Sequence, residues 1–373
     1  MTPFCRTILA VFVLLWGTTT RLSADWGKVR VTPNHAGFQL AQSGEQFTPW
    51  GVNYDHDAQG RLLEDYWSEE WENLESDFRE IRELGANVVR IHLQTGRFLK
   101  SPYEVNKDSL ERLDDLVNLA ETVGLRLNLT GLGCYHKQDV PDWYDALSEQ
   151  ERWRAQATFW GAIAERCADS PTIFCYDLMN EPVVGANRPA KDWLGPGFGG
   201  KHFVQRITLS QGDRSRPEIA RAWIATLVEA VRAHDKSTLI TVGLVPWSLD
   251  RPGLQSGFVP TECCEQLDFL SVHLYPEKDK LDEAMETLRS FQVGKPIVIE
   301  EIFPLKAGPE QVMEFLRSSR SVASGWFSFY WGKEIEEYQK GNTISDAILA
   351  DWLTRFRDAG PEFREEKNLP NDD

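Results

Sequence analysis

The sequence predicts an α/β fold: a closed (β/α)8 barrel of the TIM type, with a short N-terminal β-hairpin. Three observations predict it. Eight extended apolar runs alternate with segments of helical period. The runs are rich in Val, Ile, Leu and Phe throughout, as expected of strands that are buried on both faces. Two runs end in glutamates, Glu181 and Glu300-Glu301, and active sites of such barrels lie where the strands end.

The N-terminus has the pattern of a secretory signal peptide over residues 1–24. Arg6 supplies the basic region, Ile8–Trp16 the apolar run, and Ala24 the small residue at the cleavage point. The apolar run is shorter than the roughly 20 residues that cross a bilayer, and no later stretch is long enough. We therefore expect a secreted protein, extracellular or periplasmic, in which residues 25–373 form a single domain.

Composition narrows the class of partner. The formal net charge of −17 argues against nucleic acid or an anionic membrane, because both attract basic surfaces. Without the predicted leader five cysteines remain, an odd number that leaves at least one thiol unpaired within the chain. No cysteine or histidine spacing is that of a zinc site, so we expect no metal and no cofactor. The adjacent Cys263-Cys264 receives no function, and we expect a monomer.

The predicted elements follow in chain order. Val29–Trp50 is broken by turn residues and predicts the hairpin, placed over one end of the barrel. The eight predicted strands are Thr48–Asn53, Asn87–Leu93, Leu125–Thr130, Thr172–Asn180, Thr238–Val245, Leu267–Leu274, Pro296–Glu301 and Gly325–Trp331. A doubly wound open sheet is the alternative fold, but the first strand ends in Gly51-Val52-Asn53-Tyr54 without a glycine-rich phosphate turn.

Start and stop signals bound the helical segments between the strands. Ser148 opens a capping box, Pro217 occupies a first helical turn, and Gly85 and Gly124 follow two helix ends. The predicted helices are Glu69–Leu84, Asp108–Val123, Ser148–Arg166, Pro217–His234, Lys280–Phe291, Pro309–Ser319 and Ser345–Arg357. The fifth connection, Pro246–Gln266, is expected to carry only a short helix. The long loop Val184–Arg216 is interpreted as one wall of a substrate cleft.

The strand ends predict a two-carboxylate active site. Pro182 stops the fourth strand directly after Asn180 and Glu181, and the seventh strand ends at Glu301. Hydrolysis of a glycosidic bond needs one carboxylic acid to protonate the leaving oxygen and one carboxylate as base or nucleophile. The ends of the fourth and seventh strands face each other across a barrel mouth, where two carboxyl groups can meet at about 5 Å.

With these motifs the chain resembles the retaining glycoside hydrolases of clan A. The likeness extends from about Trp50 to Trp331 and is strongest to family five, the cellulase and mannanase family. It implies a glycoside hydrolase catalytic domain over residues 25–373 that acts on β-mannan or β-glucan. Besides Asn180-Glu181-Pro182, the motifs that carry it are Gly51-Val52-Asn53, Asn87-Val88-Val89-Arg90, Ser271-Val272-His273-Leu274-Tyr275-Pro276 and Lys295-Pro296-Ile297-Val298-Ile299-Glu300-Glu301.

The resemblance implies a role for each matching residue. Glu181 is the expected acid/base and Glu301 the expected nucleophile, held ionised by Arg90 and Tyr275. Three further residues are expected at the reacting sugar: Asn180 at its 2-hydroxyl, His273 as an orienting group beside Glu181, and Trp331 as a stacking floor.

Other assignments stay open at this level. His92 is a substrate contact or a hydrogen-bonded core histidine, and Tyr54 is a candidate substrate contact. Because successive strand residues point to opposite sides, Glu300 is expected to face outward and pair with a cation on a helix. Further candidates for the cleft are His56, His136, Trp193 and Trp247. The third strand lacks the histidine that cellulases of the family carry at its end, and His136 is a candidate substitute.

Two other classes of function compete with a retaining glycosidase. A degenerate barrel would bind sugar without turnover, although binding alone does not need two opposed acids. A metal-dependent barrel hydrolase would need clustered ligands, which the sequence does not show.

Overall fold

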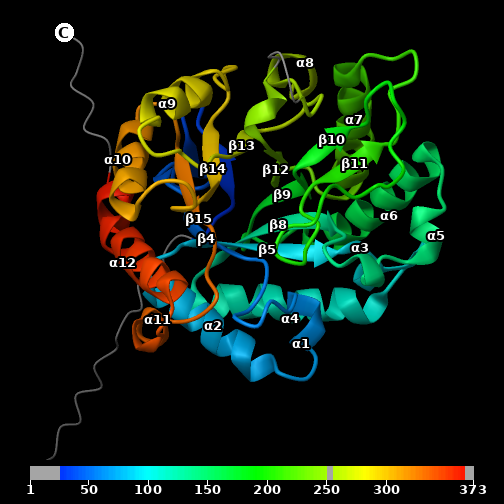
Figure 1. The fold of residues 1–373 in the computed structure, drawn as a ribbon. Coiled ribbons are helices and arrows are strands. Elements are labelled where there is room, and N and C mark those ends of the chain that lie inside the picture. Colours follow the sequence, from blue (N-terminus) through cyan, green and yellow to red (C-terminus); the bar gives the residue numbers. More distant parts are fainter. Residues whose placement is uncertain (1–25, 250–254, 366–373) are drawn as a thin grey trace, which may run out of the picture.

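The chain folds into the predicted closed parallel barrel, with helices around its outside (Figure 1). The computed structural model describes residues 26–249 and 255–365. The predicted signal peptide falls on residues 1–24, outside the described residues, and stays a prediction. In barrel order the strands are β12 Leu239–Leu244, β13 Leu270–His273, β14 Ile297–Ile302, β15 Gly325–Ser328, β4 Trp50–Tyr54, β5 Val88–Gln94, β8 Arg126–Gly133 and β9 Ile173–Asn180.

Helices cover the barrel in the predicted order. Among its described residues the fifth connection carries the short helix α8, Pro260–Cys263, and a 3-10 turn. The helices between and after the strands are α2 Trp71–Glu83, α4 Lys107–Val123, α6 Glu149–Cys167, α7 Arg216–His234, α9 Leu281–Arg289, α10 Pro309–Ser319 and α12 Ile344–Arg364. Short helices stand on the connections: α1 Leu63–Tyr66, α3 Thr95–Phe98, α5 Asp142–Asp145, α11 Ile335–Lys340, and the 3-10 turns η1 Lys137–Asp139 and η2 Pro246–Ser248.

Local chemistry sets the helix ends. The Ser148 hydroxyl accepts from the backbone of Glu151, whose side chain returns to the Ser148 backbone, so the predicted capping box forms. Gly124 ends α4 with φ 84°, a left-handed conformation that glycine adopts without steric cost. The predicted start signal of α6 and the predicted stop signal of α4 therefore both form.

The N-terminal hairpin is a three-stranded antiparallel sheet, one strand more than predicted. It contains β1 Val29–Val31, β2 Phe38–Leu40 and β3 Gln46–Phe47. Phe38 packs edge-on against Phe174 and Phe269, which precede or begin barrel strands. The sheet therefore closes the end of the barrel opposite the carboxyl ends of the strands, where the sequence placed it.

Smaller sheets lie on two connections. The loop Val184–Arg216 is more regular than predicted, because β10 Pro182–Val184 pairs in parallel with β11 Gln205–Thr208. A second small sheet joins β6 Leu99–Ser101 to β7 Glu104–Val105. None of the helices in residues 26–249 and 255–365 combines the length and the apolar character that a bilayer crossing requires.

The cysteines of the described chain are free and buried, so no disulfide links them. This extends the prediction of at least one unpaired thiol to all five, which are Cys134, Cys167, Cys175, Cys263 and Cys264.

A buried acid joins α1 to the end of β5. Glu64 is 7% exposed, and its Oε1 accepts the backbone N–H of Gln94 at 2.7 Å. Burial raises the pKa of Glu64 from its ordinary 4.5 to about 7. The folded state therefore binds more protons than the unfolded state between these pH values, and stability falls as the pH rises through them.

We predict that Glu64→Gln removes this loss. Relative to the unchanged protein, the free energy of unfolding of the variant should rise by up to about 3 kcal/mol as the pH is raised from 5 to 8.5, because the amide has no charge to bury. Urea unfolding at the two pH values measures the difference. The exposed Glu121→Gln on α4 serves as control and should show no such gain. An equal effect of Glu64→Gln at both pH values would contradict the prediction.

Candidate active site

Arg90 and Tyr275 hold Glu301 at the mouth of the barrel. Arg90 Nη1 donates to Glu301 Oε1 at 2.6 Å, and the Tyr275 hydroxyl donates to Glu301 Oε2 at 2.7 Å. Arg90 is fully buried in β5 and also donates to the side chain of Asn53 at 2.8 Å. A buried guanidinium needs such partners, so the arginine inside an apolar strand is explained by the site.

Glu181 follows the last residue of β9. Its backbone φ of 46° lies in the left-handed region, which residues other than glycine rarely adopt. Its backbone N–H donates to the carbonyl of Gly243 on β12 at 3.1 Å, and its Oε1 lies 3.0 Å from His273 Nδ1. The side chain of Glu181 keeps 16% of its surface exposed, so this carboxyl faces the mouth of the barrel.

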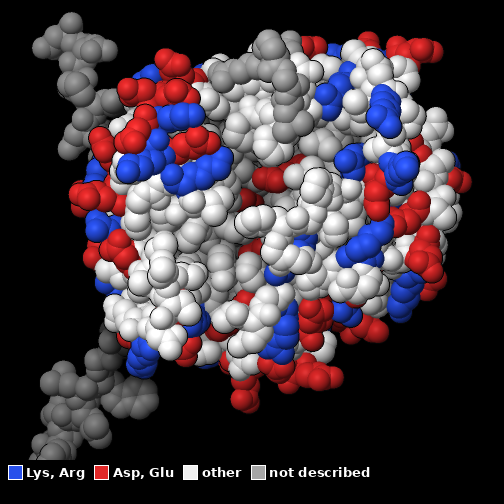
Figure 2. Space-filling view, viewed as in Figure 1, with Lys and Arg blue, Asp and Glu red and all other residues white. Residues whose placement is uncertain are grey.

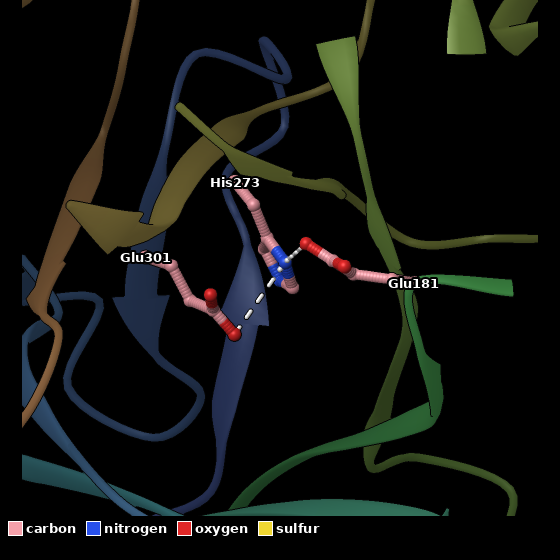
Figure 3. Close-up of side chains that lie close together, drawn as sticks. All are labelled: Glu181, His273 and Glu301. Atoms are coloured by element: carbon pink, nitrogen blue, oxygen red, sulfur yellow. Dashed lines mark hydrogen bonds and ion pairs between the residues drawn. The ribbon is translucent and has the colours of Figure 1, made fainter. Parts of the chain in front are cut away.

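The two glutamates lie on either side of His273 (Figure 3). One carboxylate oxygen of Glu181, one of Glu301 and a ring nitrogen of His273 all lie within 4.8 Å of one another. Carboxyl groups about 5–5.5 Å apart are typical of retaining glycosidases, whereas inverting enzymes need about 6.5–9.5 Å to fit a water molecule. The predicted meeting of the fourth and seventh strand ends is therefore present.

Charged side chains surround His273. Burial alone would lower its pKa, but the carboxylates of Glu301, Glu181 and Glu300 raise it to about 10. His273 Nδ1 is 3.4 Å from Glu301 Oε1 as well as 3.0 Å from Glu181. The ring is therefore an imidazolium at neutral pH, and it faces both carboxylates of the pair.

Glu300 faces the barrel interior, and the prediction that it points outward to a helix cation is wrong. It is fully buried, its Oε1 accepts from Asn128, and its Oε2 lies 3.6 Å from Arg90 Nη2. The pairing of β14 with both neighbours shifts register next to this residue. Such a bulge breaks the alternation of side chains, so Glu300 and Glu301 both reach the interior.

A further buried acid, Asp177 on β9, completes the layer beneath the mouth. Its carboxylate accepts from Arg90 Nη2 and from the Thr130 hydroxyl, each at 2.8 Å. Burial, with the neighbouring Glu300, raises the pKa of Asp177 to about 6, although Arg90 opposes the shift. The sequence analysis did not single out Asp177, yet an acid inside an apolar strand is the same signal that identified Arg90.

Opposed effects act on the two acids of β14. Burial raises the pKa of Glu301, while His273 and Arg90 oppose the rise. Burial acts in the same direction on Glu300, but there Arg90 and His273 prevail and the pKa lies below its ordinary value. The deeper carboxylate is therefore the more firmly ionised of the two.

Asn180 lies next to the carboxylate pair, as predicted. Its Oδ1 accepts from Arg90 Nη2 at 2.9 Å, and its Nδ2 donates to the Phe203 carbonyl at 3.2 Å. Nδ2 carries a second N–H, for which no partner is found within residues 26–249 and 255–365. Phe203 belongs to the loop Val184–Arg216, and its ring lies near those of Tyr135 and Phe329. This part of the loop therefore contributes to the site.

Trp331, the predicted stacking floor, is almost fully buried, and its role at the sugar stays a prediction. It is 2% exposed, and its ring meets Tyr54 edge-on with centroids 5.6 Å apart. Phe329, two residues earlier, is half-buried and lies 6.3 Å from Tyr275, the residue that donates to the nucleophile candidate. Sequence reasoning missed Phe329 because a tryptophan is the stronger signal for stacking.

Tyr54 is a packing residue and not an open substrate contact. It is 1% exposed, and its hydroxyl bonds Asp77 on α2 and accepts from Tyr66 on α1, behind the barrel wall. His92 is also buried, and its Nδ1 shares a hydrogen bond with the Tyr135 hydroxyl. Burial and the charge of Arg90 lower the pKa of His92 well below its usual range, so the core alternative describes it better.

The remaining cleft candidates fall into different places. The ring of His56 stacks on Tyr330 with centroids 4.2 Å apart and keeps some exposure. Trp193 is buried and donates to a backbone carbonyl of α5. His136 pairs with an acid three residues further on, and Trp247 is half-buried in η2. Figure 2 shows the molecule from the same side as Figure 1. The surface on this side is hollowed near its centre, with acidic atoms visible in the hollow.

A metal site was not predicted. Within the described residues, Glu181, His273 and Glu301 form a group whose ligand-type atoms are close enough to share an ion. A metal ion would compete with a proton for the His273 ring, because a ligating histidine must be neutral.

Comparisons with known proteins identify relatives of the chain and proteins with the same fold. The chain is 23% identical over 321 residues to mannan endo-1,4-beta-mannosidase A of Emericella nidulans, covering 77% of this chain and 73% of that protein. The solved structure of exo-beta-1,4-mannosidase Op5Man5 from Opitutaceae bacterium strain TAV5 matches with a TM-score of 0.66 at 16% identity. That match covers 90% of this chain and 62% of the other.

The endo-1,4-beta-mannanase from Rhizomucor miehei matches with a TM-score of 0.62 at 19% identity, over 90% of this chain and all of that one. At these identities the structural likeness establishes the barrel fold. A family model described as Cellulase (glycosyl hydrolase family 5) matches residues 41–326, well over half of the chain. The protein is therefore a glycoside hydrolase and a member of glycosyl hydrolase family 5.

Proposed function

We propose that this enzyme hydrolyses the β-1,4 linkages of a mannan or manno-oligosaccharide with retention of configuration. Glu181 is the acid/base and Glu301 the nucleophile. The observation that carries the proposal is the approach of their carboxylates to within 4.8 Å. This spacing leaves no room for a water molecule between carboxylate and sugar, so the carboxylate itself attacks.

In the first step Glu301 attacks the anomeric carbon while Glu181 protonates the departing glycosidic oxygen. Arg90 and Tyr275 each donate to one oxygen of Glu301, which keeps it anionic and aims it at the sugar. The bond from the anomeric carbon to the leaving oxygen breaks as the bond to Glu301 forms. The product of this step is a covalent glycosyl-enzyme.

In the second step Glu181, now ionised, takes a proton from water. The water oxygen attacks the anomeric carbon from the face that the leaving group vacated, and Glu301 departs as carboxylate. Two inversions give net retention. The second N–H of Asn180 Nδ2 supports both steps by donating to the hydroxyl beside the reacting carbon.

The choice of mannan over glucan rests on the relatives. The curated protein from Emericella nidulans is named for mannan, and both structural matches are named for β-1,4-mannoside cleavage. One name specifies exo action and the others endo action, so the size of the first products distinguishes the two modes for this chain. Secretion and a monomeric state stay predictions.

Proton NMR of the first minutes of hydrolysis tests the proposal. A manno-oligosaccharide should release the β-anomer before mutarotation, and the activity should survive a chelator. Mannan should be cleaved faster than β-glucan in a matched panel. Early α-anomer, loss of activity with the chelator, or sugar binding without turnover would each overturn the proposed mechanism.

A further inference from the structure

A buried acid lies directly behind the histidine of the site. Glu300 Oε2 is 3.5 Å from His273 Nε2, on the ring edge opposite the one that faces Glu181 and Glu301. Both atoms are buried, and neither has a hydrogen-bond partner within the described part of the chain. Two unsatisfied buried atoms that face each other, one a donor and one an acceptor, are natural partners.

On this geometry, and resting on the proposed function, we propose that Glu300 is a positioning residue for the acid/base and acts through His273. Its carboxylate holds one ring proton on Nε2, so that the other, on Nδ1, always faces Oε1 of Glu181. The three side chains then form a line from the barrel interior to the mouth: Glu300, His273 and Glu181.

In this arrangement His273 supplies a proton to the acid/base Glu181. The Nδ1 proton moves over 3.0 Å to Glu181 Oε1, which leaves a neutral ring that keeps its proton on Nε2. The number of protons in the pair does not change. Glu181 can therefore act as an acid as long as His273 holds its second proton, well above the pH at which an ordinary carboxyl would have lost its own.

Other charges also act on His273: Glu301 favours the protonated ring, whereas Arg90 opposes it. Glu301 lies on the Nδ1 side, and the Arg90 guanidinium stands between the interior acids. Asn128 donates to the second oxygen of Glu300 and fixes the direction of its carboxylate. The charged or titratable groups that face the ring are Glu181 from the end of β9, Glu300 and Glu301 from β14, and Arg90 and His92 from β5.

The isosteric Glu300→Gln tests the role. We expect the alkaline limb of kcat/KM for a manno-oligosaccharide to move down by about one pH unit, since the ring loses its anionic partner. At pH values above the limb the loss should approach about tenfold for this substrate, which needs a strong acid. A dinitrophenyl glycoside needs little protonation, and its cleavage should fall by about twofold at most.

Thr241→Val is the matched control. Thr241 is fully buried in β12, and its hydroxyl bonds the Phe269 carbonyl and the Ser271 hydroxyl, so the change removes an interior polar group that has no hydrogen bond to His273 within the described residues. The control should keep the alkaline limb in place for both substrates. An unmoved alkaline limb in Glu300→Gln, or an equal loss on both substrates, would overturn the role of Glu300.

Nitrogen NMR of the imidazole rings tests the proposal without a measurement of activity. In the unchanged protein at pH 7.5 both ring nitrogens of His273, assigned by their loss in His273→Asn, should carry protons, and Nε2 should keep its proton as the pH rises. A neutral ring protonated on Nδ1 would overturn the proposal. If neither substrate is hydrolysed, the proposed function fails, while this spectrum still tests the Glu300 contact.

Discussion

Replacing Glu301 with alanine is expected to lower kcat by on the order of 10⁵-fold, because no other group can form the covalent intermediate. The fold should survive. Arg90 retains Asp177 at 2.8 Å, and one buried carboxylate fewer reduces the repulsion inside the barrel. Single-turnover kinetics on a dinitrophenyl glycoside and a thermal melt measure the two effects together.

Azide should restore part of the activity of the Glu301→Ala enzyme. The anion occupies the space left by the carboxylate, attacks from the same face, and gives a glycosyl azide of inverted configuration, since only one displacement takes place. The exposed Glu283→Ala on α9 is the control and should behave as the unchanged enzyme. Full activity without azide, or an azide product of retained configuration, would exclude Glu301 as the nucleophile.

Replacing Arg90 with methionine is expected to cost about 3–5 kcal/mol of stability, because the change leaves buried carboxylates without their cation. Arg90 contacts Asp177, Glu300 and Glu301 at 2.8, 3.6 and 2.6 Å. Without it the carboxylates bind protons more tightly in the folded state than in the unfolded state. The destabilisation should therefore grow as the pH rises from about 5 to 8.

Urea unfolding at pH 5 and pH 8 measures this effect. Arg355→Met is the control, since Arg355 is exposed on α12 and pairs with Asp351, and its loss should change the free energy of unfolding by less than about 1 kcal/mol. The methionine variant should also lose turnover, because nothing then keeps Glu301 anionic. Equal stability of Arg90→Met and the unchanged protein at pH 8 would contradict the charge balance inferred for the interior.

Residues whose signal is local were placed well from sequence. Strand β9 ends at Asn180, two residues before Pro182, and the acid between them reaches the mouth of the barrel; the capping box at Ser148 and the left-handed Gly124 also form as expected. Arg90 was identified because a guanidinium in an apolar strand requires an acid, and Glu301 proved to be one of its partners. These inferences need only the preferences of a residue and its neighbours in the chain.

Residues whose direction depends on packing were placed less well. Glu300 was expected outside because strands alternate, but a register shift turned it inward. Trp331 and Tyr54 were expected at the substrate because they follow or end strands, and both are almost fully buried against neighbouring aromatic rings. Asp177 was missed although an acid inside an apolar strand is a local signal, and Phe329 was passed over in favour of the nearby Trp331.

The sequence by itself determined the barrel, the order of its strands and the pair Glu181 and Glu301, since apolar periodicity and strand-end chemistry are written along the chain. Only the tertiary structure decided which polar groups share the interior and which of them faces His273. A bulge, a crossing strand and a shared cation are set by contacts between segments far apart in the chain, and no local pattern encodes them.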